Sequence, residues 1–534
     1  MTFVQDYHTL SKHRSDGYAK GPETLDWDSQ PDPFRSYDGA DLRLMPLHKQ
    51  PGALRWQDLW QANKPGQRSL TSLADLSELL QWSLALSAWK QFGNARWSLR
   101  VNPSSGNLHP TESWLLLANI DGLADGIYHY RPDCHGLEWR CGFRTPMTSN
   151  EPQILMAFSS VLWREGWKYG ERAWRYCQHD VGHALAAVNL ALAAMGADRS
   201  ALQPVAIADA ELASLLGLDR LEEFPRVHEY EHPDCLVALT VADVDEFIQR
   251  AAAGQWQGKA NVLDPKPMYQ WPVLQQMAAA AEVTTADLPA WLATVEPAVW
   301  PAAMPASGAL ADEPASSLLL QRRSAQQFDP QGMMQQTDFF TLLDHLLLRP
   351  QLPPWQLLPL QQGVELVLFV HQVEGLPSGL YLLTRDPANQ AGLQASMRDQ
   401  FEWQKVESAP DHLPLYRLLA AGTRRTAARL NCQQTIGGDS CFTVSMLANC
   451  TNIDKQPWRY RQLYWQAGAI GQQLYLEAEA AGLRGTGIGC FFDDPALELL
   501  GLPADGGWQV LYGFTVGLPL IDHRITSWRP YQNR

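Results

Sequence analysis

The sequence repeats one pattern of landmarks in each of its two halves. Each occurrence has a glutamate before an apolar run, then two glycines and a tyrosine, with identical spacing. The landmarks are Glu112, Gly122, Gly126 and Tyr128 in the first half, and Glu365, Gly375, Gly379 and Tyr381 in the second. An apolar run, a glycine turn and a second apolar run predict a β-hairpin. One such hairpin is common, but two with the same spacing favour an internal repeat.

Two longer apolar segments extend the repeat. Residues 182–196 and 468–482 have the same length, show apolar residues at helical spacing, and end on a glycine suited to a helix C-terminus. Each is followed by Leu-Leu-Gly-Leu, at 215–218 and 499–502. Matching landmarks in matching order favour duplication over coincidence. Helices that alternate with hairpins predict an α+β architecture, with helices packed on a mainly antiparallel sheet.

The length of the chain agrees with two domains. A chain of 534 residues is too long for one ordinary hydrophobic core, and its 46% apolar and 19% charged residues are typical of an ordered globular protein. The segment 263–314 is rich in alanine and proline, which predicts a connector with some helix. We therefore expect a first copy with an N-terminal extension over 1–262, a linker over 263–314 and a second copy over 315–534.

Charge and hydropathy exclude several classes of function. The formal net charge of −15 argues against broad electrostatic binding to nucleic acid or to an anionic membrane. The longest apolar stretch, 184–197, is too short to span a bilayer. The opening residues have neither the basic region nor the apolar core of a secretory signal, so we expect a cytoplasmic location.

The cysteines and histidines do not form a recognisable metal motif. Eight cysteines are scattered without a CxxC pair, which favours reduced, buried thiols and again the cytoplasm. His179 and His183 lie four residues apart, but no third ligand accompanies them, so a cofactor-side or capping role is preferred. We expect no metal site. A redox function would therefore need an organic cofactor.

A short polar loop is the sharpest local signal in the first half. Pro103, Ser104, Ser105, Gly106 and Asn107 follow one another and offer hydroxyl, amide and backbone N–H donors. Such a loop suits hydrogen bonding to the polar edge of a planar heterocycle. The same residue types dominate ordinary turns, so composition alone leaves a plain turn open.

Two segments of the second half could also bind a ligand. Arg322, Arg323 and Ser324 follow the linker, at the start of an expected helical stretch, and could clamp a phosphate because arginine offers a planar bidentate fork. The glycine-rich loop 485–489 would let backbone amides approach a ligand closely. Taken alone, an Arg-Arg-Ser string is usually a solvated surface, and a glycine-rich segment usually turns the chain.

The polar loop resembles a segment of a known family. It is similar to the Pro-Ser-Ser-x-Asn loop of FMN-dependent nitroreductases. The longer segment 103–112 resembles the P-S-x-G-x-L-x-P-x-E segment of their SagB-type branch, which oxidises azoline rings in modified peptides. The segments 167–175 and 180–183 and the N-terminal stretch 7–31 resemble the same branch. The resemblance implies a nitroreductase-like fold and FMN as the cofactor.

The resemblance also implies which residues hold the FMN. In that family an Arg-Arg-Ser motif binds the FMN phosphate, a glycine segment approaches the reactive edge of the flavin, and a basic residue near the C-terminus completes the phosphate site. The residues implied here are Pro103, Ser104, Ser105, Gly106, Asn107, Arg322, Arg323, Ser324, Gly487, Ile488, Gly489 and Arg524. In the SagB-type branch a Lys-Tyr pair serves acid–base catalysis, which implies Lys168 and Tyr169 as the catalytic residues.

The two halves carry complementary parts of this pattern. The first half has neither the Arg-Arg-Ser motif nor the Gly-x-Gly. The second half has 356–360 in place of the polar loop, and Asp454 and Lys455 in place of the Lys-Tyr pair. Nitroreductases are two-fold dimers that bind flavin between subunits. The resemblance therefore implies an intrachain pseudo-dimer of two diverged copies with one composite FMN site, either a monomer or a higher homo-oligomer.

Three functions follow from these observations. The preferred one is an FMN oxidoreductase that dehydrogenates an azoline-like heterocycle, either a small molecule or a ring borne by a peptide. An NAD(P)H-dependent reductase of nitro or quinone compounds is the alternative enzyme. A flavin-binding or docking protein without turnover is the alternative from another class, because function lies in the site and not in the fold.

Overall fold

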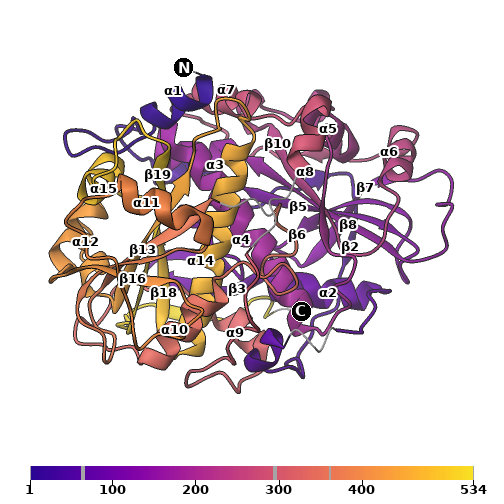
Figure 1. Ribbon diagram of the computed structural model, residues 1–534. Coiled ribbons are helices and arrows are strands. Elements are labelled where there is room, and N and C mark those ends of the chain that lie inside the picture. The colour runs from indigo at the N-terminus through magenta and orange to yellow at the C-terminus, as the bar shows by residue number, and fades with distance from the viewer. Residues whose placement is uncertain (1, 62–65, 293–297, 360–362, 533–534) are drawn as a thin grey trace.

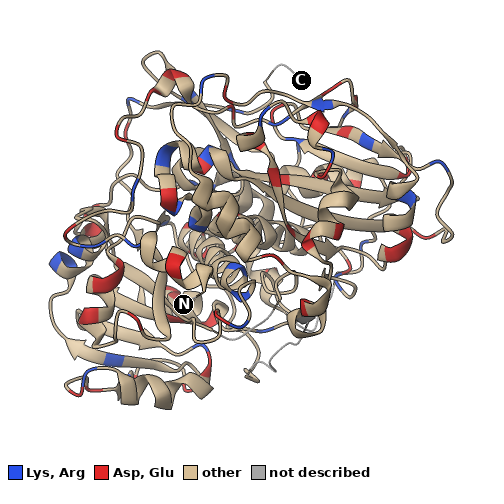
Figure 2. Cartoon of the chain, turned by 90° about the horizontal axis from the view of Figure 1, so that it is seen from above, with Lys and Arg blue, Asp and Glu red and all other residues tan. Residues whose placement is uncertain are grey.

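A computed structural model describes residues 2–61, 66–292, 298–359 and 363–532. The chain forms two halves that lie side by side, each with a large β-sheet, and two long helices run between them (Figure 1). These helices are α4, Ala173–Ala194, and α14, Arg459–Ala480, each of 22 residues. Acidic and basic residues are interspersed over the elements of both halves (Figure 2), so the view shows no segregated basic region.

The first half contains an antiparallel sheet of eight strands. Seven of them follow the order β11-β7-β6-β5-β8-β10-β9, and β2 pairs with β7. The strands are β2 (Asp41–Leu44), β5 (Thr111–Ala118), β6 (Gly126–Arg131), β7 (Gly136–Gly142), β8 (Gln153–Val161), β9 (Gln203–Val205), β10 (Glu231–Ala238) and β11 (Gln255–Trp256). A separate two-stranded ribbon joins β1 (Tyr37–Asp38) to β12 (Lys259–Ala260).

The second half contains an antiparallel sheet of seven strands in the corresponding order, β15-β16-β14-β13-β17-β19-β18. The strands are β13 (Val364–Val370), β14 (Gly379–Leu383), β15 (Gln404–Lys405), β16 (Leu415–Ala420), β17 (Phe442–Asn449), β18 (Arg484–Ile488) and β19 (Trp508–Gly517). The expected α+β architecture with mainly antiparallel sheets is therefore what the chain adopts.

Both predicted hairpins are confirmed, and they agree in detail. β5 pairs with β6, and β13 pairs with β14. A bulge lies between Ile127 and Tyr128 in the first half and between Leu380 and Tyr381 in the second. Each tyrosine hydroxyl donates a hydrogen bond of 2.7 Å to the carbonyl oxygen four residues earlier. The repeated spacing in the sequence thus folds into a repeated structure.

The two central helices cross where two glycines meet. A Cβ atom on Gly182 would lie 2.2 Å from the carbonyl oxygen of Trp465. A Cβ atom on Gly468 would lie 2.2 Å from the carbonyl oxygen of His179. Because real Cβ contacts are never this short, only glycine allows the two backbones to approach so closely.

Shorter helices cover the sheets and the ends of the central pair. They are α1 (Phe3–Leu10), α2 (Leu73–Ser83), α3 (Leu162–Tyr169), α5 (Asp209–Leu216), α6 (Val244–Ala252), α7 (Pro272–Ala280), α8 (Leu288–Leu292), α9 (Ala315–Gln321), α10 (Gln336–His345), α11 (Gln390–Ser396), α12 (Arg424–Leu430), α13 (Ile436–Asp439) and α15 (Asp493–Leu500). Separate apolar cores include residues of α5 and α6 in the first half and of α11, α12 and α15 in the second. The largest core surrounds α4 and α14 and joins the halves. As predicted, each central helix is followed by a glycine with positive φ, Gly196 at 67° and Gly482 at 73°.

Two predicted local structures are wrong. The sequence predicts a helix beginning at the Arg-Arg-Ser motif, but α9 ends before it and Arg322 has an extended ψ of 129°. The apolar residues that drive this helix precede the arginines. The glycine-rich segment predicts a loop, but 484–488 form the edge strand β18. Glycine is needed there because a Cβ on Gly485 would lie 2.6 Å from the ring of Phe514.

Both ends of the chain reach the opposite half. Near the N-terminus, the Lys12 ammonium pairs with Asp494 at 2.7 Å. Near the C-terminus, β20 (Thr526–Trp528) pairs with β3 (Leu86–Phe92), which also pairs with β4 (Ala95–Arg100). These exchanges hold the halves together beside their shared core. Over the described residues, no helix is long and apolar enough to cross a membrane.

Candidate functional site

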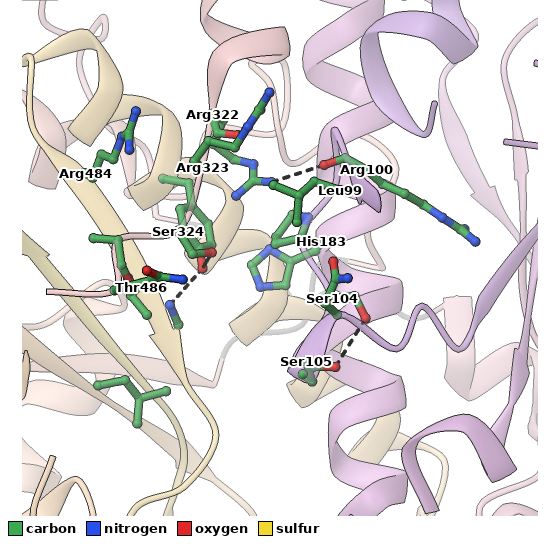
Figure 3. Close-up of a pocket in the computed structure, with 18 of the residues that line it drawn as sticks. Leu99, Arg100, Ser104, Ser105, His183, Arg322, Arg323, Ser324, Arg484 and Thr486 are labelled. Carbon is green, nitrogen blue, oxygen red and sulfur yellow. Dashed lines mark hydrogen bonds between the residues drawn. The ribbon is translucent and has the colours of Figure 1, made fainter. Parts of the chain in front are cut away.

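One cavity of about 630 Å³ is lined by residues of both halves (Figure 3). The first half contributes Lys90, Trp97, Leu99, Arg100, Asn102, Pro103, Ser104, Ser105, Gly106, Asn107, His109, Tyr169, Tyr176, Asp180 and His183. The second half contributes Arg322, Arg323, Ser324, Ala325, Gln326, Gln434, Tyr475, Arg484, Thr486, Gly487, Ile488, Gly489, Cys490, Tyr512 and residues 519–522, 525 and 527. The cavity therefore joins segments that are hundreds of residues apart in the sequence.

One part of the cavity wall is positively charged. It gathers Arg322, Arg323 and Arg484 from the second half and Lys90 from the first. Burial, together with repulsion from Arg323 and Arg484, lowers the pKa of Lys90. Burial and repulsion from Arg322 lower the pKa of Arg323 to about 10. An anion such as a phosphate would relieve this repulsion and would accept hydrogen bonds from these groups.

The two arginines of the motif differ in what they bind. Arg322 is buried, its Nε donates to the carbonyl oxygen of Val101 at 2.9 Å, and its guanidinium lies 4.9 Å from the ring centroid of Tyr475. Its Nη1 has no hydrogen-bond partner among the described residues. Arg323 donates to backbone carbonyl oxygens, including that of Ser87 at 3.0 Å. Arg322 therefore has an unpartnered N–H group that can donate to a ligand, whereas Arg323 donates to backbone carbonyl oxygens.

The glycine-rich strand forms another part of the wall. The N–H of Gly487 donates to the hydroxyl oxygen of Tyr475 at 2.9 Å, and this hydroxyl lies 2.9 Å from the Ser324 hydroxyl. A Cβ atom on Gly487 or Gly489 would lie 2.0 or 2.1 Å from a tyrosine side chain. Glycine at both places lets the tyrosines pack against the strand. The strand therefore presents its backbone to the cavity.

The polar loop forms the wall that belongs to the first half. Gly106 and Asn107 have positive φ angles of 58° and 61°. The backbone N–H and the hydroxyl of Ser105 each donate to Asp180 Oδ1 at 3.1 Å. A Cβ atom on Gly106 would lie 2.6 Å from the Tyr169 hydroxyl oxygen, so the loop packs directly on that tyrosine. Asp180 and Tyr169 together fix the loop against the cavity.

Two ionisable groups of α4 also line the cavity. Burial raises the pKa of Asp180 to about 7, although hydrogen bonds from Ser104 and Ser105 oppose the shift. A carboxyl group with a pKa near neutrality can take up or release a proton at physiological pH. His183 stays neutral because burial lowers its pKa to about 3, and its Nε2 lies 3.1 Å from the Tyr512 hydroxyl.

The two predicted catalytic residues lie in different positions. Tyr169, the last residue of α3, lines the cavity with its ring centroid 4.6 Å from that of Tyr176. Lys168 does not line it, and its Nζ lies 5.8 Å from the ring centroid of Trp27 and 5.3 Å from that of Tyr169. Burial lowers the pKa of Lys168, against the attraction of Glu165. Lys168 thus lies behind the wall that Tyr169 forms.

Among the predicted cofactor-binding residues, the structure brings all but Arg524 to the cavity. Arg524 is exposed, and its guanidinium pairs with Asp522, two residues earlier, at 2.8 Å. The guanidinium carbon also lies 5.4 Å from the ring centroid of Phe92. Arg524 itself does not line the cavity, although its partner Asp522 does, and Lys90 and Arg484 supply positive charge there.

Several lining residues have no site role predicted from the sequence. They include Lys90, Tyr176, Asp180, Tyr475, Arg484 and Tyr512. Lys90 and Arg484 belong to no sequence motif. Strand pairing brings them to the cavity from distant segments. Tyr176, Asp180 and His183 share one face of α4, and this helical spacing was a usable signal.

The segment that replaces the polar loop in the second half packs differently. Leu357 and Leu358 are buried, and Leu360 lies outside the described residues. The side-chain oxygen of Gln356 accepts a hydrogen bond of 2.8 Å from Arg199 of the first half. The described residues of this segment are therefore buried or bonded to the first half, and they do not line the cavity.

The chemistry of the cavity fits FMN. Its positive part includes the unpartnered Nη1 of Arg322, which suits a phosphate. Its other walls offer the hydroxyls and backbone N–H groups of the polar loop and the exposed backbone of the glycine strand. Among the described residues, no group of three or more His, Cys, Asp and Glu could hold a metal ion.

Comparison with protein families gives a match in the second half. Residues 319–518, less than half of the chain, match the model of the Nitroreductase family. Members of this family generally use a flavin, and the match supports an oxidoreductase enzyme. No curated protein is significantly similar to the chain in sequence.

Solved structures extend the likeness in fold to the first half. A protein from Anabaena variabilis assigned to the nitroreductases is 22% identical, with a TM-score of 0.67 over 97% of this chain and 100% of that one. One from Ralstonia eutropha is 18% identical over 43% of this chain and 89% of its own, with a TM-score of 0.26. The microcin synthetase complex of E. coli is 19% identical over 37% and 71%, with a TM-score of 0.25. The Anabaena structure shows that nearly the whole chain has a nitroreductase-like fold.

Proposed function

We propose that the chain is an FMN-dependent oxidoreductase with one composite flavin site between its halves. The observation that carries this proposal is the single cavity that gathers the polar loop of the first half with the arginine and glycine segments of the second. Neither half contains all of these segments. When bound, FMN would supply a carrier that accepts or donates a hydride.

The residues of the cavity divide the binding of FMN between them. Arg322 would donate through Nη1 to the phosphate, and Lys90 and Arg484 would add positive charge. The polar loop 103–107 and the strand segment 487–489 would bind the ring system through hydroxyl and backbone donors. The composite site thus needs both halves.

We also propose that the halves are diverged copies, bounded as 1–262 and 315–534, that pair as a dimer within one chain. Two ion pairs support this. Arg175 of α4 pairs with Asp493 at 2.7 Å, and Arg461 of α14 pairs with Asp209 at 2.9 Å. Each arginine lies the same number of residues before the crossing glycine of its helix, and each aspartate is the first residue of α15 or α5.

The proposed reaction is dehydrogenation of an azoline-like heterocycle, either a small molecule or a ring on a peptide. Such a ring loses a proton as well as a hydride, so the site needs an acid–base group. Tyr169 stands in the wall for this role, and Asp180 is a second group with a pKa of about 7. Lys168 would act through Tyr169, because its ammonium lies behind that ring.

Anaerobic reduction of the bound flavin tests this proposal. The purified chain should be yellow, and an azoline-containing peptide should bleach its flavin, whereas Tyr169→Phe should slow the bleaching. Bleaching by NADH or NADPH alone would favour the reductase of nitro or quinone compounds. A flavin inert to all of these compounds, or a chain that takes up no FMN, would contradict the proposal.

A further inference from the structure

Two cysteines meet at the edge of the cavity. Cys490 lines the cavity directly after the glycine-rich strand. The segment of Cys432 lies against it: the N–H of Phe492 donates to the carbonyl oxygen of Leu430 at 2.8 Å, and Gln434 Nε2 donates to that of Cys490 at 3.2 Å. The two thiols share a side-chain hydrogen bond. Both residues are half-exposed, whereas five of the other cysteines are buried. The proposed flavin site uses neither thiol. The pair therefore needs its own explanation.

Histidine and arginine side chains surround the Cys490 thiol. The His13 ring shares a side-chain hydrogen bond with Cys490. Its Nδ1 lies 3.0 Å from the N–H of Ala19 and accepts from it, which leaves the proton of the neutral ring on Nε2. The guanidinium of Arg172 donates through Nε and Nη2 to the carbonyl oxygen of Gly489, at 3.3 and 3.1 Å. Hydrogen-bond donors and a cation thus face this sulfur.

The nearby carboxylate does not cancel this environment. Asp493 binds Arg172 and Arg175 at 2.9 and 2.7 Å, so its charge is already paired. The hydrogen bond from Cys432, followed by those of His13 and the charge of Arg172, lowers the pKa of Cys490. The same hydrogen bond raises the pKa of Cys432. The pair therefore holds one thiolate beside one thiol, and the thiolate is the reactive form of cysteine.

We propose that Cys490 and Cys432 form a redox-active dithiol that a hydroperoxide oxidises to a disulfide. The Cys490 thiolate attacks the terminal oxygen of the peroxide, the O–O bond breaks, and the leaving alkoxide takes a proton to become an alcohol. The sulfenic acid formed at Cys490 is then attacked by the sulfur of Cys432. The S–S bond forms as the S–O bond breaks, and water leaves with the proton of Cys432. The two sulfurs lose two electrons, which the peroxide gains.

Thiol counting with peptide mapping tests the proposal on the full chain. One equivalent of hydrogen peroxide should remove two of the eight thiols, and a non-reducing digest should show a peptide that joins 432 to 490. Cys432→Ser should leave a sulfenic acid at Cys490 that dimedone labels, and Cys490→Ser should keep all its remaining thiols. Cys134→Ser is the matched control, since Cys134 is also half-exposed, and it should still lose two thiols.

Alkylation of the unmodified chain gives a second readout that needs no variant. Iodoacetamide at mildly acidic pH should label Cys490 about tenfold faster than Cys432, because hydrogen-bond donors and a cation face the Cys490 sulfur, whereas the shared hydrogen bond and burial raise the pKa of Cys432. Equal labelling rates, or a peroxide-induced disulfide that joins other cysteines, would overturn the proposal. Neither measurement requires turnover or bound flavin, so its result is independent of the proposed oxidoreductase activity.

Discussion

The cavity and the place related to it by exchange of the halves differ in chemistry, although the same framework surrounds both. On the cavity side the polar loop leaves room for a ligand, whereas on the other side Leu357 and Leu358 are buried and Arg199 binds Gln356. The cavity-lining residues of α4 are Tyr176, Asp180 and His183. Their counterparts on α14, at the same distances from the crossing glycine, are Gln462, Gln466 and Ala469. The titratable side chains of the cavity side are thus replaced by amide and methyl side chains at the corresponding positions.

The framework, in contrast, is kept on both sides. The glycine crossing, the hairpin bulges and the ion pair between a central helix and the next short helix all occur twice. Packing between the halves therefore needs both sides, whereas the proposed flavin site needs one. Substitutions at corresponding positions can therefore separate the two requirements.

The largest loss of stability is expected for substitutions in the two interhelical ion pairs. Asp493→Asn should destabilise the chain by about 3–5 kcal/mol, because it leaves Arg172 and Arg175 buried with one neutral partner. Asp209→Asn should cost less, since burial outweighs Arg461 and raises the pKa of Asp209. Denaturant midpoints of both variants, measured with the wild type, give the comparison. Equal losses of stability would mean that the two ion pairs contribute equally to the free energy of unfolding.

The pH dependence of these variants should also differ. Two arginines lower the pKa of Asp493 to about 2, below the usual aspartate value near 3.8, so its stabilising contribution is complete above about pH 4 and is lost as pH falls towards 2. The pKa of Asp209 is raised, so the contribution of Asp209 to the free energy of unfolding falls as pH rises through that pKa. The difference between wild type and Asp493→Asn should therefore shrink in acid, and a constant difference would contradict this account.

The second comparison concerns catalysis. Tyr169→Phe and Lys168→Ala should each slow reduction of the flavin by substrate by about 100-fold or more while FMN stays bound, the usual scale for a lost acid–base group. Lys455→Ala, at the corresponding exposed position of the second half, should leave the rate unchanged. Rapid-mixing absorbance of the flavin measures both. Wild-type rates in the Tyr169 and Lys168 variants would remove these residues from the mechanism.

The repeat and its elements could be predicted because they depend on local patterns. The hairpins and the caps at Gly196 and Gly482 follow from spacing and from glycine at fixed positions. The cavity depends on long-range pairing, which brings Lys90 and Arg484 to one wall without any local signal. The resemblance implies Arg524 as a residue of the phosphate site, but its guanidinium pairs with Asp522 and does not line the cavity.

The third comparison concerns cofactor binding. Arg322→Ala should weaken FMN binding by about 10- to 100-fold, as expected for loss of a hydrogen bond of about 1.5–3 kcal/mol to a charged group. Arg199→Ala should leave FMN affinity unchanged, because Arg199 binds Gln356 and does not line the cavity. Fluorescence titration of flavin-free protein with FMN gives both constants. Equal losses in the two variants would count against a single site.

The smallest expected effect is the pH dependence of turnover. Because the pKa of Asp180 is raised to about 7, its carboxyl group changes from protonated to charged as pH rises through neutrality. The rate of flavin reduction should change by a few-fold across this range in the wild type but not in Asp180→Asn. An unchanged pH profile in the variant would exclude Asp180 as the titrating group.

The amount of FMN per chain is a direct test of one composite flavin site. Denaturing the purified, FMN-saturated protein and measuring the absorbance of the released flavin gives this ratio. We expect one FMN for each chain, because the residues that suit FMN line one cavity between the halves. A ratio near two would show that the second side also binds flavin and would contradict the composite site.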